Sequence, residues 1–169
     1  SDQYAPYNDS CAYLPSMGGD HTIEGTIWKA PGIPGSPNLE VELLVSWRGD
    51  NAQRTTPYGP SQSTGYEINI NQNGDYLILG RYKGAELSRA VSPPRPANGD
   101  KFKARFVNNG NGTVTITVWW NGVLLPFTNG NPFTDSSPQP AGFPGIGFYV
   151  DSGGPTNQFG YSSVTVTKP

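Results

Sequence analysis

The segment TVTITVWWNG, from Thr113 to Gly122, carries two adjacent tryptophans. Its alternation predicts a strand, in which successive side chains point to opposite faces of a sheet. Trp120 then shares a face with three aliphatic side chains, which is typical of a core, whereas Trp119 shares a face with three threonines. Exposed rings stack on the apolar faces of sugars, so Trp119 is a candidate carbohydrate platform. The alternative is that Trp119 packs beneath the N-terminal segment or a loop.

Other strand-like segments supply further rings and polar groups. A sugar site needs hydrogen-bonding side chains between its aromatic rings. The candidate carbohydrate-binding residues are Trp119, Trp28 and Tyr82 as rings, with Arg81, Glu67, Asn69, Arg48 and Glu42 as polar partners. Tyr66 shares a strand face with Ile68 and Ile70, so we expect it in the core.

Glu40 and Glu42 form a carboxylate pair whose spacing would suit catalysis. Residues i and i+2 of a strand share a face about 7 Å apart, and glycosidases use two carboxylates roughly 5 to 10 Å apart. Such pairs are also common on solvated strands. His21 is the only histidine and lies at the start of a strand-like segment, where it indicates a surface residue. No catalytic residue is assigned, although a tyrosine-based lyase stays open.

Metal-binding patterns are few. Zinc is disfavoured because the chain has one cysteine and one histidine. Loops 134–139 and 150–154 contain the oxygen ligands that a structural calcium could use, but no complete calcium loop is present. The metal ligands are therefore unknown. No Gly-rich stretch links a strand to a helix, so a phosphate cradle is not expected.

Composition points to an all-β domain and narrows the range of partners. The 22 glycines and 17 prolines among 169 residues separate short alternating stretches, which is typical of strands joined by turns. The net charge of −2 and the scattered Lys and Arg disfavour nucleic acid. No apolar run is long enough for membrane insertion. Cys11 is alone and suggests a buried filler. The chain begins at Ser1, which leaves a processed, secreted protein open.

The alternating stretches suggest one domain of stacked antiparallel sheets. In residues 39–48 the pattern places Val41, Leu43, Val45 and Trp47 inward. Asn73-Gly74 predicts a tight hairpin between residues 65–70 and 76–84. Residues 1–20 have no clear period, so we expect an irregular N-terminal arm, followed by a β-sandwich domain over residues 21–169. A polar loop at 49–64 could place Arg54 and Tyr58 at the rim of a groove, but a mobile, solvated loop is the favoured expectation.

Several motifs resemble the concanavalin A-like (laminin-G-like) jelly-roll domains of secreted bacterial proteins. The resemblance rests on Gly99-Asp100 before a strand, the strand ending at Asn121-Gly122, the GFPGIGF segment at 142–148 and a last strand begun by Phe159. The segment GYEINI and the following GDYLILGRYKG are similar to the family's central hairpin. The resemblance implies a concanavalin A-like β-sandwich whose ligands bind on the concave face of one sheet. The family's glucanase and alginate-lyase signatures are absent.

Three functions are compatible with these features. We expect a non-catalytic, extracellular, lectin-like domain that recognises a polysaccharide or another glycan. One alternative is a structural or adhesion subunit of a surface filament or phage particle, with homo-oligomers that bury the same aromatics. The other is a polysaccharide lyase or glycoside hydrolase, against which the missing motifs count.

Overall fold

The computed structural model describes residues 10–33, 35, 38–48, 63–82, 84–151 and 157–169. Its only helical element in these ranges is the short 3-10 helix η1 (Pro15–Met17). The strands are β1 (Ser10–Tyr13), β2 (His21–Lys29), β3 (Leu39–Arg48), β4 (Thr64–Asn71), β5 (Leu77–Arg81), β6 (Glu86–Arg89), β7 (Lys101–Asn108), β8 (Val114–Trp120), β9 (Val123–Leu124), β10 (Phe133–Asp135), β11 (Phe143–Val150) and β12 (Phe159–Thr167).

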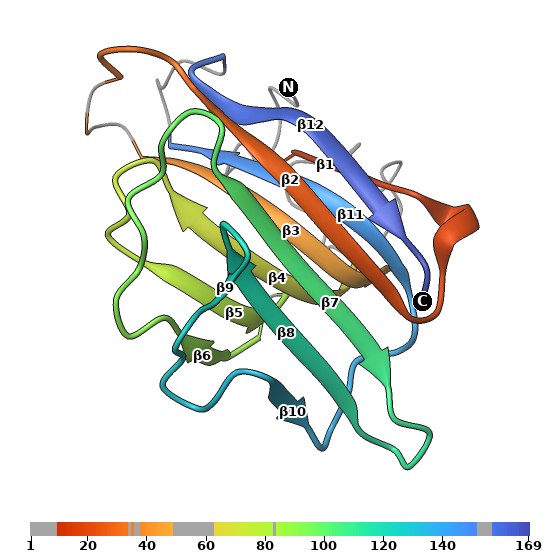
Figure 1. Ribbon diagram of the computed structural model, residues 1–169. Coiled ribbons are helices and arrows are strands. Elements are labelled where there is room, and N and C mark those ends of the chain that lie inside the picture. The colour runs from red at the N-terminus through yellow and green to blue at the C-terminus, as the bar shows by residue number, and fades with distance from the viewer. Residues whose placement is uncertain (1–9, 34, 36–37, 49–62, 83, 152–156) are drawn as a thin grey trace.

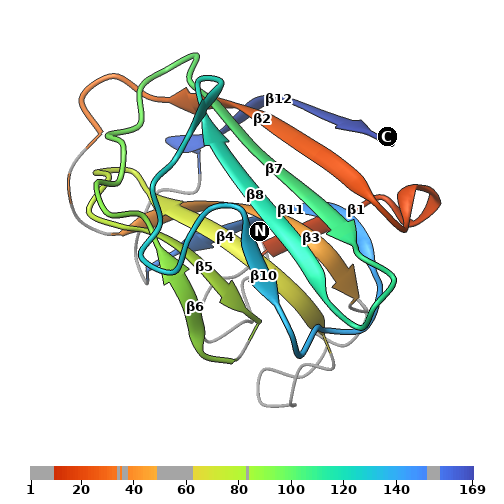
Figure 2. The same ribbon diagram turned by 60° about the horizontal axis from the view of Figure 1, so that its bottom comes forward.

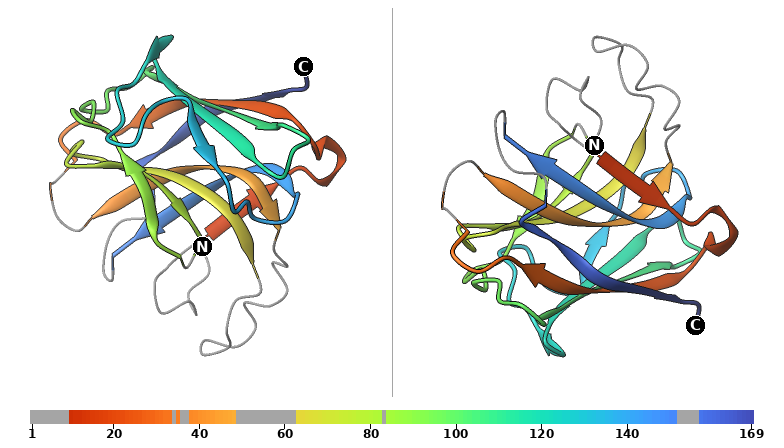
Figure 3. Two further views of the ribbon diagram at one scale, coloured as in Figure 1. Left: turned by 90° about the horizontal axis from the view of Figure 1, so that it is seen from below. Right: turned by 90° about the horizontal axis from the view of Figure 1, so that it is seen from above.

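These strands form two antiparallel sheets that stack face to face (Figures 1 and 2). Sheet A has the order β1-β11-β3-β4-β5-β6, and sheet B has the order β10-β8-β7-β2-β12, with β9 paired to β8. Strands that are distant in sequence pair in both sheets, as when β12 pairs with β2. Figure 3 shows the two layers from either end. The predicted all-β sandwich is confirmed.

The core lies between the two sheets and follows the predicted alternation. On β7, Phe102, Ala104 and Phe106 are buried, while the lysines and arginine between them point to solvent or the outer surface. Trp120 and Tyr66 both join the core cluster, as expected. Burial of these apolar side chains from both sheets is the main favourable contribution to folding.

One inward assignment on β3 is wrong. Ser46 has a φ of 52°, and the pairing of β3 with β4 shifts register between Val45 and Arg48. Such a bulge inserts one extra residue and changes which face the following side chains occupy. Trp47 is buried but lies outside the inter-sheet core cluster, and its ring packs edge-on against Tyr82 at 4.8 Å.

The beginning of the chain contains more regular structure than the expected irregular arm. Residues Ser10–Tyr13 form β1, which pairs with β11 as an edge strand of sheet A. η1 then leads into β2 through Gly18 and Gly19. The hairpin predicted at Asn73-Gly74 joins β4 to β5, and Gly74 has the positive φ of 72° that such a turn requires. Residues 1–9, Arg54 and Tyr58 lie outside the described residues.

Candidate functional site

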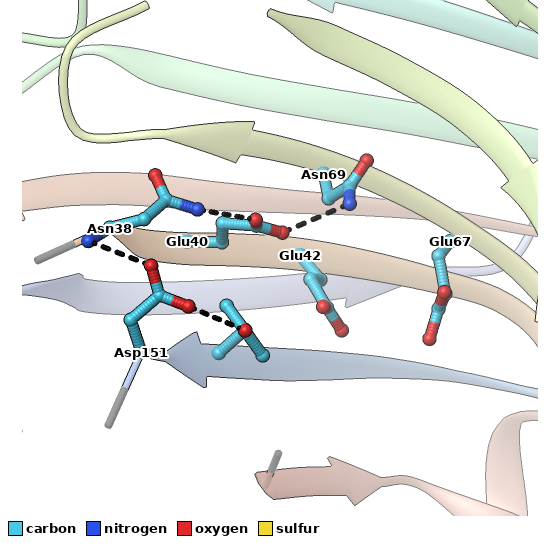
Figure 4. A pocket seen from close by; sticks show the side chains of 7 residues that line it. Asn38, Glu40, Glu42, Glu67, Asn69 and Asp151 are labelled. Carbon is cyan, nitrogen blue, oxygen red and sulfur yellow. Dashed lines mark hydrogen bonds between the residues drawn. The ribbon is translucent and has the colours of Figure 1, made fainter. Parts of the chain in front are cut away.

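A polar hollow of about 310 Å³ opens on the outer face of sheet A. β3 and β4 each contribute two side chains, and the end of β11 contributes one, because alternate residues of neighbouring strands share a face. The lining residues are Asn38, Glu40, Glu42, Glu67, Asn69, Tyr149 and Asp151. Figure 4 shows Glu40, Glu42 and Glu67 rising from this face, with Asn69 beside them. We call this site the acidic hollow.

Glu40 is held in place by three donors. Its Oε1 accepts hydrogen bonds from Asn38 Nδ2 at 2.8 Å and from the hydroxyl of Tyr76, and its Oε2 accepts one from Asn69 Nδ2 at 3.0 Å. Burial raises the pKa of Tyr76, and the hydrogen bond to Glu40 raises it further, so this hydroxyl keeps its proton and donates. Glu40 is therefore a fixed carboxylate that orients its neighbours.

Asn38 and Asp151 close one end of the hollow. The backbone N–H of Asp151 donates to the Asn38 carbonyl at 3.0 Å, and the Asn38 N–H donates to Asp151 Oδ2 at 3.3 Å. Tyr149 donates from its hydroxyl to Asp151 Oδ1 at 2.6 Å. Asn71 in turn donates to Asn38 Oδ1 at 3.1 Å. The polar groups at this end are thus positioned before any ligand binds, which lowers the entropy cost of binding.

Glu42 depends on a glycine in the neighbouring strand. Gly147 of β11 lies directly across from Glu42, and a Cβ at this position would clash with Glu42 Oε2 and lie 2.9 Å from its Cδ. Glu42 is accordingly almost fully buried. Burial raises the pKa of Tyr161, and the charge of Glu42 contributes to that rise. The missing side chain at position 147 therefore makes the space in which the Glu42 carboxylate lies.

The charge of the acidic hollow has one sign. Glu40, Glu42, Glu67 and Asp151 supply four carboxylates, and none of the lining residues is Lys or Arg. Carboxylates accept hydrogen bonds from hydroxyl groups and attract cations, whereas they repel other anions. The amide groups of Asn38 and Asn69 add donors and acceptors. The site can therefore bind a ligand rich in hydroxyl groups, and it opposes one that carries carboxylate or sulfate.

The structure brings three of the predicted site residues together, namely Glu42, Glu67 and Asn69, and it does not bring the remaining five to the same place. Glu40 and Glu42 share a face, as their spacing predicts. Arg48 is exposed at the end of β3, opposite Thr64 of β4, and does not line the hollow. Tyr82 packs against Trp47. The eight candidates therefore do not form one groove, and a sugar-binding role for each of them stays a prediction.

Arg81 faces sheet B rather than the outer face of sheet A. Its guanidinium donates to Asp135 of β10 at 2.6 and 3.1 Å, and Tyr66 donates to the same carboxylate at 2.8 Å. Burial alone would raise the pKa of Asp135, but the hydrogen bonds from Arg81, the Ser137 amide and Tyr66 outweigh it and hold that pKa below its ordinary value. Arg81 thus forms an ion pair between the two sheets.

Trp119 and Trp28 lie on the outer face of sheet B. Trp119 sits across from Lys103, whose Nζ lies 5.6 Å from the centroid of its ring. Lys103 also pairs with Glu24 of β2 at 3.2 Å. Trp28 is 38% exposed. Trp119 therefore packs beside β9 and a lysine, away from the acidic hollow, and a role in stacking on sugars stays a prediction.

Four lining residues were not predicted as sugar ligands: Glu40, which the sequence suggested only as part of a carboxylate pair, and Asn38, Tyr149 and Asp151. Tyr149 alternates with Gly147 and Gly145 along β11, a pattern that places it on the outer face beside two positions without side chains. Asp151 follows that strand directly and was considered only as a calcium ligand. The strand pairing that brings β11 next to β3 is needed to find them.

The expected calcium sites receive little support from the geometry. The carboxylate of Asp135 accepts hydrogen bonds from Arg81, Tyr66 and Ser137, which occupy its oxygens. Within the described ranges, no three His, Cys, Asp or Glu side chains are grouped so that they could hold a metal ion. Part of the 150–154 loop lies outside those ranges.

No described helix is both long and apolar enough to cross a membrane.

The sequence matches no protein-family model and no curated protein. Solved structures are similar at low identity. The metal-free carbohydrate recognition domain of Emp46p has a TM-score of 0.57 at 12% identity, over 96% of this chain and 79% of that one. That of Emp47p has a TM-score of 0.52 at 13% identity, over 96% and 80% of the two chains.

A Bacillus subtilis protein of unknown function with a galectin-like fold is also similar, with a TM-score of 0.52 at 10% identity over 94% of this chain and 74% of that one. At identities this low, the structural similarity establishes the fold but not the ligand. The two antiparallel sheets, their order and these similarities identify the fold of this chain as a concanavalin A-like jelly roll.

Proposed function

We propose that this chain is a non-catalytic, lectin-like domain that binds a carbohydrate in the acidic hollow on sheet A. The observation that carries the proposal is the set of carboxylate and amide groups fixed by hydrogen bonds around a hollow of about 310 Å³. Sugar hydroxyl groups donate to carboxylates and pair with amides, so this lining complements a glycan. The carbohydrate recognition domains of Emp46p and Emp47p share the fold, which supports the proposal.

The charge of the hollow favours a neutral glycan. Four carboxylates without a basic residue among the lining side chains would repel uronic acids and sulfated sugars. A neutral polysaccharide meets no such repulsion and offers many hydroxyl donors. A secreted or extracellular location belongs to the same proposal, because extended polysaccharides of this kind are encountered outside the cell.

A binding role agrees better with the geometry than catalysis does. A general acid must release and take up a proton at a reacting atom. Glu40 accepts hydrogen bonds from Asn38, Tyr76 and Asn69, so it has a structural role in fixing the hollow. Because its oxygens already accept these hydrogen bonds, Glu40 is poorly placed to act as a general acid or base in a pair with Glu42. The hollow is therefore better suited to binding hydroxyl groups than to catalysis.

The test is a calorimetric titration of the chain with a panel of neutral and anionic polysaccharides. Glu67→Gln keeps the shape of the side chain and removes one carboxylate from the hollow, whereas Glu24→Gln removes one from the outer face of sheet B. We expect saturable binding to a neutral glycan, at least about tenfold weaker in Glu67→Gln and unchanged in Glu24→Gln.

Two results would contradict the proposal. One is the absence of binding to every glycan in a panel that includes neutral polysaccharides. The other is binding that survives in Glu67→Gln but is lost in Trp119→Phe, which would move the site to sheet B. Assay of the same mixtures for new reducing ends or unsaturated products tests catalysis directly.

A further inference from the structure

The two sheets do not close over the core where β12 of sheet B faces β1 of sheet A. An apolar groove of about 260 Å³ lies there, lined by Ala12, Tyr13, Leu14, Ile23, Pro144, Gly145, Ile146, Val164 and Val166. Val166 is paired with Ile23, a core residue, so both β12 valines point inward. Val164 nevertheless remains 39% exposed, and Leu14 at the rim is 47% exposed.

β12 is also the one long edge strand in the described part of the chain. The other three sheet edges are β1, β6 and β10, with four, four and three residues, whereas β12 has nine. Short edge strands, charges and prolines are the usual protections against edge-to-edge pairing. Residues Phe159–Thr167 contain no charged residue and no proline. Among the described strands, β12 pairs only with β2 (Figure 1).

The sequence of β12 is complementary to itself. A bulge near Ser162 leaves Ser163–Thr167 as the regular part of the strand. If two such strands pair antiparallel about a two-fold axis at Thr165, Val164 of each copy lies opposite Val166 of the other. Both valines point to the groove side, so the pairing brings groove to groove and covers the exposed apolar surface of both copies.

Charge does not oppose this arrangement. Lys168 follows the strand, and in the two-fold pairing each Lys168 lies beside Ser162 of the other copy. The two lysines are then about 20 Å apart, from six residues of about 3.3 Å each, which exceeds the screening length of roughly 8 Å at physiological salt. The uncharged stretch between them places no like charges in contact.

We propose that two copies of this chain associate through β12, with antiparallel pairing of Ser163–Thr167 and contact between the two apolar grooves. The regular edge is only about 17 Å long, so the pairing alone is smaller than the roughly 1,200 Å² of a standard interface. The valines and the groove add apolar contact to this short edge, and the whole interface stays at the small end of the range for protein dimers. The dimer is therefore weak, with dissociation in the micromolar range.

Sedimentation velocity of the chain from about 1 to 500 μM tests this association. We expect the mass to rise from 18.1 kDa toward twice that value with concentration. Val164→Lys places a charge in the groove at an already exposed position, and it should weaken the dimer at least tenfold. Val123→Lys is the matched control, because Val123 is 66% exposed on β9, away from this edge.

A crosslink tests the position of the axis. Thr165→Cys in a Cys11→Ser background places the two new thiols opposite each other, within the Cα separation that a disulfide accepts. Mild oxidation should give a covalent dimer, which Val123→Cys in the same background should not. The proposal is overturned if the unmodified chain stays monomeric at 500 μM, if Val164→Lys dimerises as the unmodified chain does, or if higher oligomers replace the dimer. Thermal unfolding of each variant verifies its fold.

Discussion

The two outer faces of the sandwich arise from the same alternation of side chains but use their charges differently. On sheet A, the acidic hollow gathers four carboxylates, and amides and tyrosines hold two of them in place. On sheet B, Lys103 lies between Glu24 and the ring of Trp119, and Lys101 donates to Thr26 at 2.6 Å. Carboxylates are thus gathered and fixed on sheet A, whereas on the described outer face of sheet B a carboxylate is mixed with lysines, so the preorganised acidic site lies on sheet A.

The largest effect should come from Gly147→Ala. The new methyl group would collide with Glu42 and displace its carboxylate, so we expect at least about a tenfold loss of glycan affinity and about 1–3 kcal/mol of stability. Calorimetry and urea unfolding measure the two effects. Gly160→Ala is the control on sheet B, where a Cβ would lie 3.7 Å from Phe148, an ordinary contact. Equal behaviour of the two variants would remove the role given to Gly147.

The next effect concerns an added carboxylate on each face. Asn69→Asp replaces the amide that donates to Glu40 with a like charge, which should cost about 1–2 kcal/mol of unfolding free energy. Thr26→Asp places the same group beside Lys101 and should change stability by less than about 0.5 kcal/mol. Urea unfolding at neutral pH compares them. If both variants lose the same stability, the faces do not differ in charge as described.

A smaller effect is expected from the protonation of His21, which limits the pH range in which the stabilities of variants on the two faces can be compared. His21 is buried, stacks on Phe106 at 5.4 Å and donates from Nδ1 to the Gly19 carbonyl at 2.7 Å. Burial lowers its pKa below 6.5, although Gly19 and Asp20 partly oppose that effect. The unfolded chain therefore binds the proton more readily, and stability is lost as the pH falls below about 6.5.

Urea unfolding between pH 7.5 and 5 measures this loss, which should not exceed about 1.4 kcal/mol per pH unit for one group. His21→Phe keeps a ring against Phe106 and removes the titration, so its stability should vary less over the same range. An identical pH profile in the variant would assign the loss to other groups.

The smallest effect is expected on sheet B. Lys103→Met removes the pair with Glu24 and the charge above Trp119 but keeps the aliphatic stem. Because these groups are partly exposed, we expect a change of no more than about 0.5–1 kcal/mol in stability and none in glycan affinity. A clear loss of affinity, measured by calorimetry, would indicate that the face with Trp119 takes part in binding.

The sequence predicted the sandwich and the cores of its strands because alternation depends only on neighbouring residues. It placed Phe102 and Tyr66 in the core for this reason, and Asn73-Gly74 located a hairpin through local turn geometry. It failed at Trp47, where a bulge at Ser46 interrupts the alternation without a local signal. The burial of His21, expected at the surface, depends on β7 lying alongside β2.

The candidate site was predicted only in part, since it depends on which strands are neighbours. Glu42, Glu67 and Asn69 come from strands adjacent in both sequence and space, and the pattern placed them correctly on one face. Tyr149 lies near the end of β11 and Asp151 directly follows that strand, both more than a hundred residues after Glu42, and only the pairing of β11 with β3 brings them to the hollow. Arg81 falls on the same strand face as the buried Leu77 and Leu79, so the alternation alone places it inward, and only the other sheet reveals its partner Asp135.

The ion pair of Arg81 with Asp135 joins the two sheets at one side of the sandwich, so local unfolding should cost more free energy at that side than at the other. Near β4, β5 and β10, separating the sheets would leave charged groups without their partners, which is costly. At the opposite side, β12 has one neighbour and incompletely covered valines. Backbone amides of β12 should therefore exchange with deuterium through local opening, while those of β4 exchange only when the whole domain unfolds.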